Sequence, residues 1–156
     1  MQITPEEHYF IEKWSRFFED AGGSKTLGRV FGYLLLADEP KNLDQIASDL
    51  LFSKATASLT IRQGLSIRLF EKIGRPGERR DYYRASTQSW IEASLAKLQI
   101  LDDWKLLLEQ GLSLVPEESR NARRNLLEMK DYLDFMCWYL SDIREFYQRW
   151  KNGELG

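Results

Sequence analysis

Six hydroxyl-bearing or cationic side chains fall within residues 53–62, and three arginines follow within residues 75–80. Hydroxyl and cationic groups can hydrogen-bond to base edges, and arginine neutralises phosphate groups. The chemistry that we expect from such a set is noncovalent recognition of a duplex nucleic acid. The expected contact residues are Ser53, Lys54, Thr56, Ser58, Thr60, Arg62, Arg75, Arg79 and Arg80.

Two short helices are expected to position the first part of this set. Residues 42–51 carry apolar side chains at the i, i+3, i+4, i+7 spacing of one helix face. Asn42 can cap that helix, with Gln45 as its reciprocal partner. A second helix begins at Ser53 and directs Ala57 toward the core, which leaves its small, hydroxylated and cationic side chains to enter a major groove.

A β-hairpin is expected to follow the two helices. Residues 69–73 and 81–85 are apolar or aromatic stretches that flank the turn-rich sequence GRPGERR at residues 74–80. A helix pair followed by an arginine-tipped hairpin is typical of a winged helix-turn-helix. We therefore predict a mainly α fold with a two-stranded β-wing and long C-terminal dimerisation helices.

The charge distribution supports nucleic-acid binding, although the formal net charge is only −2. Residues 1–52 hold 5 basic and 9 acidic side chains, residues 53–84 hold 8 and 3, and residues 85–156 hold 9 and 12. All the positive excess thus lies where phosphate contacts would need it. The acidic remainder is expected to repel DNA and so favour one docking face.

Two further helices are expected before this module. The first begins at Pro5 with Thr4 as its cap. Its predicted buried stripe is Phe10, Trp14, Phe17, Phe18 and Ala21. The second helix begins at Ser24 and contains Gly28 and Gly32, four residues apart, which indicates a close backbone approach by a neighbouring helix.

The second half of the chain is expected to form a long helical hairpin. One helix runs from Ser86 or Thr87 to about Leu112, and the last helix follows Pro116. Apolar residues in the last helix alternate in steps of three and four, which is a heptad seam. That seam is Leu126, Met129, Leu133, Met136, Leu140, Ile143, Tyr147 and Trp150. Beside it runs a second stripe: Tyr132, Phe135, Tyr139 and Phe146.

Two apolar stripes on one terminal helix exceed what a small monomer can cover, so we predict a homodimer. The expected dimerisation residues are Leu133, Met136, Tyr139, Leu140 and Ile143. An alternative stays open: the seam packs within the chain against Leu98, Leu101 and Leu108, and the second stripe makes the dimer contact. We expect residues 1–86 to bind DNA and residues 87–156 to dimerise, within one compact unit.

Other classes of protein are poorly supported. With one histidine and one cysteine, Cys137, the chain cannot assemble a soft-metal ligand set. We expect no cofactor and no enzymatic activity. No run of 18 apolar residues indicates a membrane span, and the lone thiol suits a reducing cytoplasm, where we expect the protein to act.

The chain resembles the GbsR-type branch of the MarR family of winged-helix regulators. The matching segments are residues 26–36, residues 53–58 and, most specifically, residues 76–84 (PGERRDYYR). The resemblance implies a dimer that binds a palindromic operator in double-stranded DNA and often responds to a small molecule. Residues 63–64 (QG) depart from it, because such proteins usually carry leucines there.

We therefore expect a homodimeric, sequence-specific transcriptional regulator, a repressor that a small-molecule effector releases. The aromatic residues of the second half either fill a dimer core or cage a quaternary ammonium effector. The alternative function is a winged-helix module that holds protein partners without reading DNA.

Overall fold

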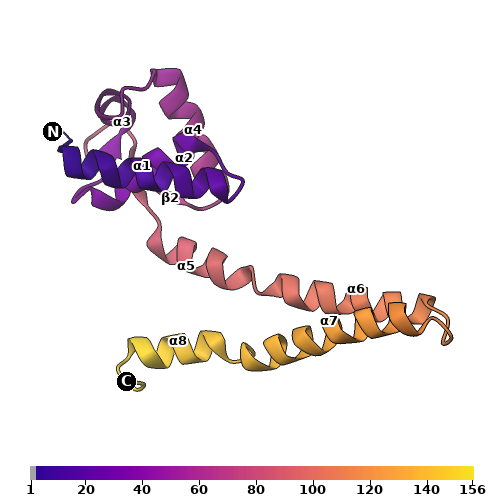
Figure 1. Cartoon of the computed structure of the whole chain (residues 1–156). Helices are drawn as coiled ribbons and strands as arrows, with labels where there is room; N and C mark the ends of the chain where they lie inside the picture. Colours follow the sequence, from indigo (N-terminus) through magenta and orange to yellow (C-terminus); the bar gives the residue numbers. More distant parts are fainter. Residues whose placement is uncertain (1–2) are drawn as a thin grey trace. The chain divides into compact units, whose positions relative to one another are not determined.

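The computed structural model describes residues 3–156 and is mainly helical, with one small antiparallel sheet (Figure 1). The predicted fold class is confirmed. The chain divides into two compact units, one ending at Ile91 and the other spanning Glu92–Gly156. This division lies within a helix, α5 (Thr87–Ala96), rather than at its start.

The first unit contains four helices, a three-stranded sheet and the beginning of α5. Its elements are α1 (Pro5–Asp20), α2 (Lys25–Leu36), β1 (Lys41–Asn42), α3 (Leu43–Asp49), α4 (Lys54–Ser66), β2 (Phe70–Ile73) and β3 (Tyr82–Ala85). The sheet order is β1-β3-β2, with Asn42 opposite Tyr82. The two-stranded hairpin that we predicted is therefore extended by a third, short strand that leads directly into α3.

Helices α1 and α2 pack at very short range, as the glycine spacing predicted. A Cβ atom at Gly28 would lie 2.6 Å from the carbonyl oxygen of Trp14, and one at Gly32 would lie 3.1 Å from the Trp14 Cβ. Neither site can hold a larger residue without moving the backbone or the base of the half-buried Trp14 side chain. The two glycines thus lower the helix propensity of α2, but they allow close contact between α1 and α2.

The buried stripe of α1 differs from our prediction. Ile11 and Ser15 are its buried residues, with Trp14 and Phe18 packed half-buried against the core. Phe10 and Phe17 lie exposed on the surface, and so does Ala21. The prediction followed the largest aromatic side chains and so placed the stripe a few positions away from the side that faces α2.

The core of the first unit joins α2, α3 and α4. Its most completely buried side chains are Ile11, Val30, Phe31, Ile46, Leu50 and Ile61. The Tyr33 hydroxyl of α2 donates a 2.6 Å hydrogen bond to Asp49 at the end of α3, and burial raises the pKa of this tyrosine. Because α3 and α4 share this core with α2, the two helices of the helix-turn-helix are held rigidly together.

The second unit is a helical hairpin built from α6 (Gln99–Leu114) and α7 (Arg120–Tyr139), which run side by side (Figure 1). It ends with α8 (Ile143–Lys151). We predicted two unbroken helices, and both predictions were wrong, because turns at residues 97–98 and 140–142 divide them. At the second turn, the Ser141 hydroxyl donates to the carbonyl oxygen of Trp138, a local bond that competes with helix continuation.

The middle of the predicted heptad seam faces the interior of this unit, whereas its members Met129 and Trp150 are exposed. Leu133 is only 3% exposed, and Leu108 of α6 is buried as well. Leu140 and Ile143 are half-buried and line one cavity with Leu98, in the turn between α5 and α6, and with residues of both helices. Leu133 is therefore a core residue of the hairpin and not a surface dimer contact, which corrects our first assignment of this residue. The burial of Leu133 agrees with the alternative in which the seam packs within the chain, while a dimer contact through the second stripe stays a prediction.

The second stripe stays on the surface. Its members Tyr132, Phe135, Tyr139 and Phe146 are all exposed, and the Phe135 and Tyr139 rings stack at 5.9 Å. Trp104, Met129 and Trp138 add further exposed apolar area in the same unit. So much exposed aromatic surface is unusual for a monomeric protein.

Candidate nucleic-acid interface

Helix α4 is the element expected to read DNA, and its start is fixed by local hydrogen bonds. The Ser53 side chain accepts from the Thr56 amide at 3.0 Å, and the two hydroxyls lie 2.8 Å apart. The preceding turn is made by Leu51, which adopts φ +56° and is 90% exposed. This tight turn places α4 directly after α3, as a helix-turn-helix requires.

One face of α4 is fully buried. Ala57, Thr60, Ile61 and Gly64 form it, at the i, i+3, i+4, i+7 spacing of a helix side. Thr60 is only 3% exposed, and its hydroxyl donates to the carbonyl oxygen of Thr56 at 2.8 Å. Our assignment of Thr60 to base contact is therefore wrong, because this side chain faces the core and satisfies its hydrogen bond within the helix.

The opposite face of α4 also contains apolar and amide side chains, which were not among the hydroxyl-bearing and cationic residues that we predicted to contact DNA. Ala55, Leu59 and Gln63 are exposed alongside Lys54 and Arg62, and Leu59 is 63% exposed. Thr56 and Ser58 lie half-buried at the margins of this face. The buried positions of α4 are themselves a helical period, and counting half a turn from them would have identified Ala55 and Leu59.

The wing is the hairpin β2–β3 with its tip at residues 74–81. Gly77 adopts φ +81°, and the Glu78 amide donates to the carbonyl oxygen of Arg75 to close the turn. The Arg75 guanidinium lies 4.1 Å from the centre of the Tyr82 ring and 3.1 Å from Glu39. Arg75 is therefore held by one contact within the wing, to Tyr82, and by one contact to Glu39, which precedes β1.

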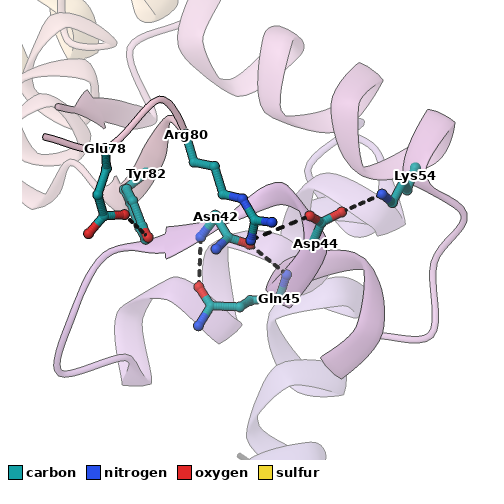
Figure 2. Close-up of polar contacts among 7 residues, drawn as sticks. All are labelled: Asn42, Asp44, Gln45, Lys54, Glu78, Arg80 and Tyr82. Atoms are coloured by element: carbon teal, nitrogen blue, oxygen red, sulfur yellow. Dashed lines mark hydrogen bonds and ion pairs between the residues drawn. The ribbon is translucent and has the colours of Figure 1, made fainter. Parts of the chain in front are cut away.

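Figure 2 shows a second polar arrangement beside the wing. The Tyr82 hydroxyl donates to the Glu78 carboxylate, while Arg80 reaches from the wing toward Asp44 at the start of α3. Arg79 and Arg80 are both exposed. Two of the three predicted wing arginines are thus presented to solvent, and Arg75 is held in place.

Most cations of this region are paired with carboxylates. Of the eight basic side chains in residues 53–84, five form ion pairs. These pairs are Lys54–Asp44, Lys72–Asp81, Arg75–Glu39, Arg80–Asp44 and Arg84–Glu71. Within residues 3–156, Arg62, Arg68 and Arg79 form no such pair.

The pairing affects proton affinity in the expected directions. The hydrogen bond from Lys54 lowers the pKa of Asp44, and the charges of Lys54 and Arg80 add to that effect. The hydrogen bond to Asp81 raises the pKa of Lys72. Both groups therefore stay fully charged at neutral pH, and the region is a mosaic of charges with a net positive balance.

Metal-binding and membrane-spanning features are absent from the described part of the chain. Residues 3–156 contain no group of histidine, cysteine and carboxylate side chains arranged to hold a metal ion. Among the same residues, no helix combines the length and the apolar character needed to cross a bilayer.

Comparison with known proteins places the chain among regulators. A family model described as an MmpR5-like MarR family transcriptional regulator matches residues 88–153. The HTH-type transcriptional regulator MmpR5 of Mycobacterium tuberculosis is 25% identical over 155 residues, which cover 99% of this chain and 93% of the relative. The HTH-type transcriptional repressor OpcR of Bacillus subtilis is 27% identical over 160 residues, covering 94% and 86%.

A solved structure shares the architecture. The crystal structure of a transcriptional regulator aligns with a TM-score of 0.65 and 25% sequence identity, covering 93% of this chain and 99% of that one. The family match lies in the helical second half, whereas the relatives also span the winged first half. The chain is a DNA-binding transcriptional regulator with a winged-helix fold, and it is similar to regulators of the MarR family.

Proposed function

We propose that this regulator is a homodimeric repressor that inserts α4 of each subunit into the major groove of a palindromic operator. The observation that carries the proposal is the division of α4 into a fully buried face and an exposed face. Because the buried face locks the helix to the core, the exposed face is presented as a rigid reading surface. This is how a recognition helix works in the helix-turn-helix motif.

The proposed base and backbone contacts combine predicted and newly found residues. From the predicted set we retain Ser53, Lys54, Thr56, Ser58 and Arg62, with Arg79 and Arg80 in the wing. We add Ala55 and Leu59, because exposed apolar side chains on a recognition helix can contact the methyl group of thymine. The wing arginines contribute phosphate contacts, which add affinity more than sequence choice.

The homodimer is supported by the second stripe of the C-terminal unit. Tyr132, Phe135 and Tyr139 are exposed along α7, and Phe146 continues the stripe on α8. A two-fold contact through this stripe would bury aromatic area that is otherwise in water. Met136, Leu140 and Ile143, which we also predicted to dimerise, are half-buried and would support the contact from within the subunit.

The direction of regulation and the effector are also proposals. OpcR is named a repressor, which supports repression by this chain, and the sequence resemblance supports placement in the GbsR-type branch. A small molecule that changes the spacing of the two α4 helices would release the operator, because half-sites lie about 34–36 Å apart. We propose that this regulation takes place in the cytoplasm.

The test begins with selection of bound fragments from genomic DNA, followed by gel-shift titration of the recovered operator. Leu59→Glu should weaken binding by about 100-fold, because a carboxylate in the groove faces base edges and phosphates. Ser66→Glu adds the same charge at the exposed end of α4 and serves as the matched control. Equal losses for both variants would overturn the placement of α4, and absence of any operator would overturn the function.

A further inference from the structure

One carboxylate lies between the two elements that face DNA in the proposed complex. Asp44 Oδ1 accepts Lys54 Nζ of α4 at 2.6 Å, and Asp44 Oδ2 lies 3.9 Å from Arg80 Nη1 of the wing. Figure 2 shows Asp44 with Lys54 on one side and Arg80 on the other. The Asp44 carboxylate thus forms one ion pair with a cation of the recognition helix and one with a cation of the wing.

The position of Asp44 is fixed by the fold. It is the second residue of α3, between the two members of a capping box. The Asn42 side chain accepts from the Gln45 amide at 2.9 Å, and the Gln45 side chain accepts from the Asn42 amide at 2.9 Å. Because Asn42 is buried and also pairs with Tyr82 across the sheet, the carboxylate is held at a defined place between α4 and the wing.

The cationic side chains next to the Asp44 carboxylate are of the kind that bind phosphate groups. Asn42, Leu43, Asp44, Lys54, Ser58 and Arg80 all line one hollow between α3, α4 and the wing. The cationic side chains around it are those that would otherwise approach the DNA backbone, and both are largely exposed. A carboxylate at this place pairs with these two cations as a phosphate would, because both groups are negatively charged and both accept hydrogen bonds through oxygen atoms.

We propose that Asp44 is an internal competitor for the DNA backbone, which holds Lys54 and Arg80 in the free protein and yields both to phosphates in the complex. The proposal rests on the proposed function, in which α4 and the wing face DNA. Exposed ion pairs are weak, so the exchange is readily reversible. Random duplexes are bound almost entirely through their phosphates. Asp44 therefore lowers the affinity for random duplexes below the value that Lys54 and Arg80 would give without a competing carboxylate.

The test measures binding of the full chain to a random-sequence duplex by fluorescence anisotropy at several salt concentrations. Asp44→Asn should tighten binding about threefold to tenfold, because two exposed ion pairs no longer compete. It should also steepen the dependence of log affinity on log salt by about one unit. Asp20→Asn at the exposed end of α1 makes the same charge change and should alter affinity by less than about twofold.

A second set of variants tests whether Asp44 acts through its two partners. In a Lys54→Gln, Arg80→Gln background, Asp44→Asn should have no further effect on affinity or on the salt slope. Asp44→Glu keeps the charge and should bind as the wild type does, while Asp44→Ser offers a second neutral variant that suits the first turn of a helix. Circular dichroism of each variant should match that of the wild type, which checks that the helices are retained.

The outcomes separate the two proposals. Equal effects of Asp44→Asn and Asp20→Asn, together with weaker binding by the Lys54→Gln, Arg80→Gln protein, would overturn the competitor and leave the interface standing. Unchanged binding by the Lys54→Gln, Arg80→Gln protein would remove both cations from the interface and overturn the competitor as well. A gain confined to Asp44→Asn and Asp44→Ser that vanishes in the double-glutamine background supports the proposal.

Discussion

The Phe70 ring of β2 lies against the backbone of Gly64 in α4. A Cβ atom at Gly64 would come within 2.1 Å of the Phe70 Cδ2 and Cε2 atoms, which is far inside contact distance. Phe70 is almost completely buried. The ring from β2 thus fills the space that a side chain at position 64 would occupy. Helix α4 nevertheless continues to Ser66.

We predict that Gly64→Ala destabilises the protein although alanine favours helix formation. Overpacking of a buried site costs about 1–3 kcal/mol, and the gain in helix propensity offsets at most about 1 kcal/mol. The free energy of unfolding, measured by urea titration with circular dichroism, should therefore fall. Gly74→Ala is the control, since a Cβ there meets no atom within 4 Å and should change stability little.

A double substitution shows whether Phe70 is the cause. Phe70→Leu removes ring atoms that an added methyl at Gly64 would strike, so the combined variant should lose less stability than the two single losses together. Strict additivity would mean that Gly64 is required for another reason.

We predict that Leu51→Gly stabilises the chain. Leu51 adopts φ +56°, a left-handed conformation that costs a residue with a side chain about 1–2 kcal/mol and glycine almost nothing. Its side chain is almost fully exposed, so little packing is lost. After the entropy of the more flexible unfolded chain, a net gain of about 0.5 kcal/mol is expected. Leu59→Gly, within α4, should instead lose about 1 kcal/mol in the same unfolding experiment.

We predict that Thr60→Val leaves operator affinity within about twofold of the wild type. The Thr60 side chain faces the core and its hydroxyl donates a hydrogen bond to the carbonyl oxygen of Thr56, so we expect this side chain to make no contact with DNA. Arg62→Gln, on the exposed face, should weaken operator binding in the same gel-shift assay. A large loss for Thr60→Val with its melting temperature unchanged would restore Thr60 to the interface.

We predict that two arginines of the wing respond differently to removal. Arg79→Ala should reduce the slope of log affinity against log salt by about one, because Arg79 is exposed and free of ion pairs within residues 3–156. Arg75→Ala should leave the slope near its original value but lower stability, because Arg75 stacks on Tyr82 and pairs with Glu39. Identical slopes for both variants would contradict this division.

We predict separate roles for the two stripes of α7. Leu133→Ala should destabilise the helical unit by about 2–5 kcal/mol, as a cavity in a buried site does. Tyr139→Glu, at a position 63% exposed, should leave helix content unchanged and shift the protein from dimer to monomer in analytical ultracentrifugation. A wild-type protein that sediments as an 18.4 kDa monomer at micromolar concentration would contradict the dimer.

The elements that follow strict local rules could be predicted from the sequence. The capping box of Asn42 and Gln45, the start of α4 at Ser53 and the strands of the wing all depend on neighbours within a few residues. The close approach at Gly28 could be predicted too, because glycine in a helix has few other uses.

Features that depend on distant partners were missed. Thr60 is buried because the core packs around α4. Its hydroxyl, which bonds within the helix, made this core position look like a polar surface position in the sequence. The turn at residues 140–142 interrupts a periodic apolar pattern that shows no break in the sequence. Lys54 and Arg80 pair with Asp44, which lies outside residues 53–84, and the count of charges by segment therefore overstated the free positive charge.

Asn42 belongs to two elements at once, as the last residue of β1 and as the cap of α3. Through Tyr82 it joins the hairpin to the helix pair. The hairpin and the helix pair should therefore open as one cooperative unit in hydrogen exchange, with the amides of Gln45 and Tyr83 exchanging at similar rates. For the evolution of binding specificity, this means that the tip, which lies beyond the pairing of Ile73 with Tyr82, is free to change in length and sequence, whereas the strand position opposite Asn42 is inherited together with the helix that Asn42 caps.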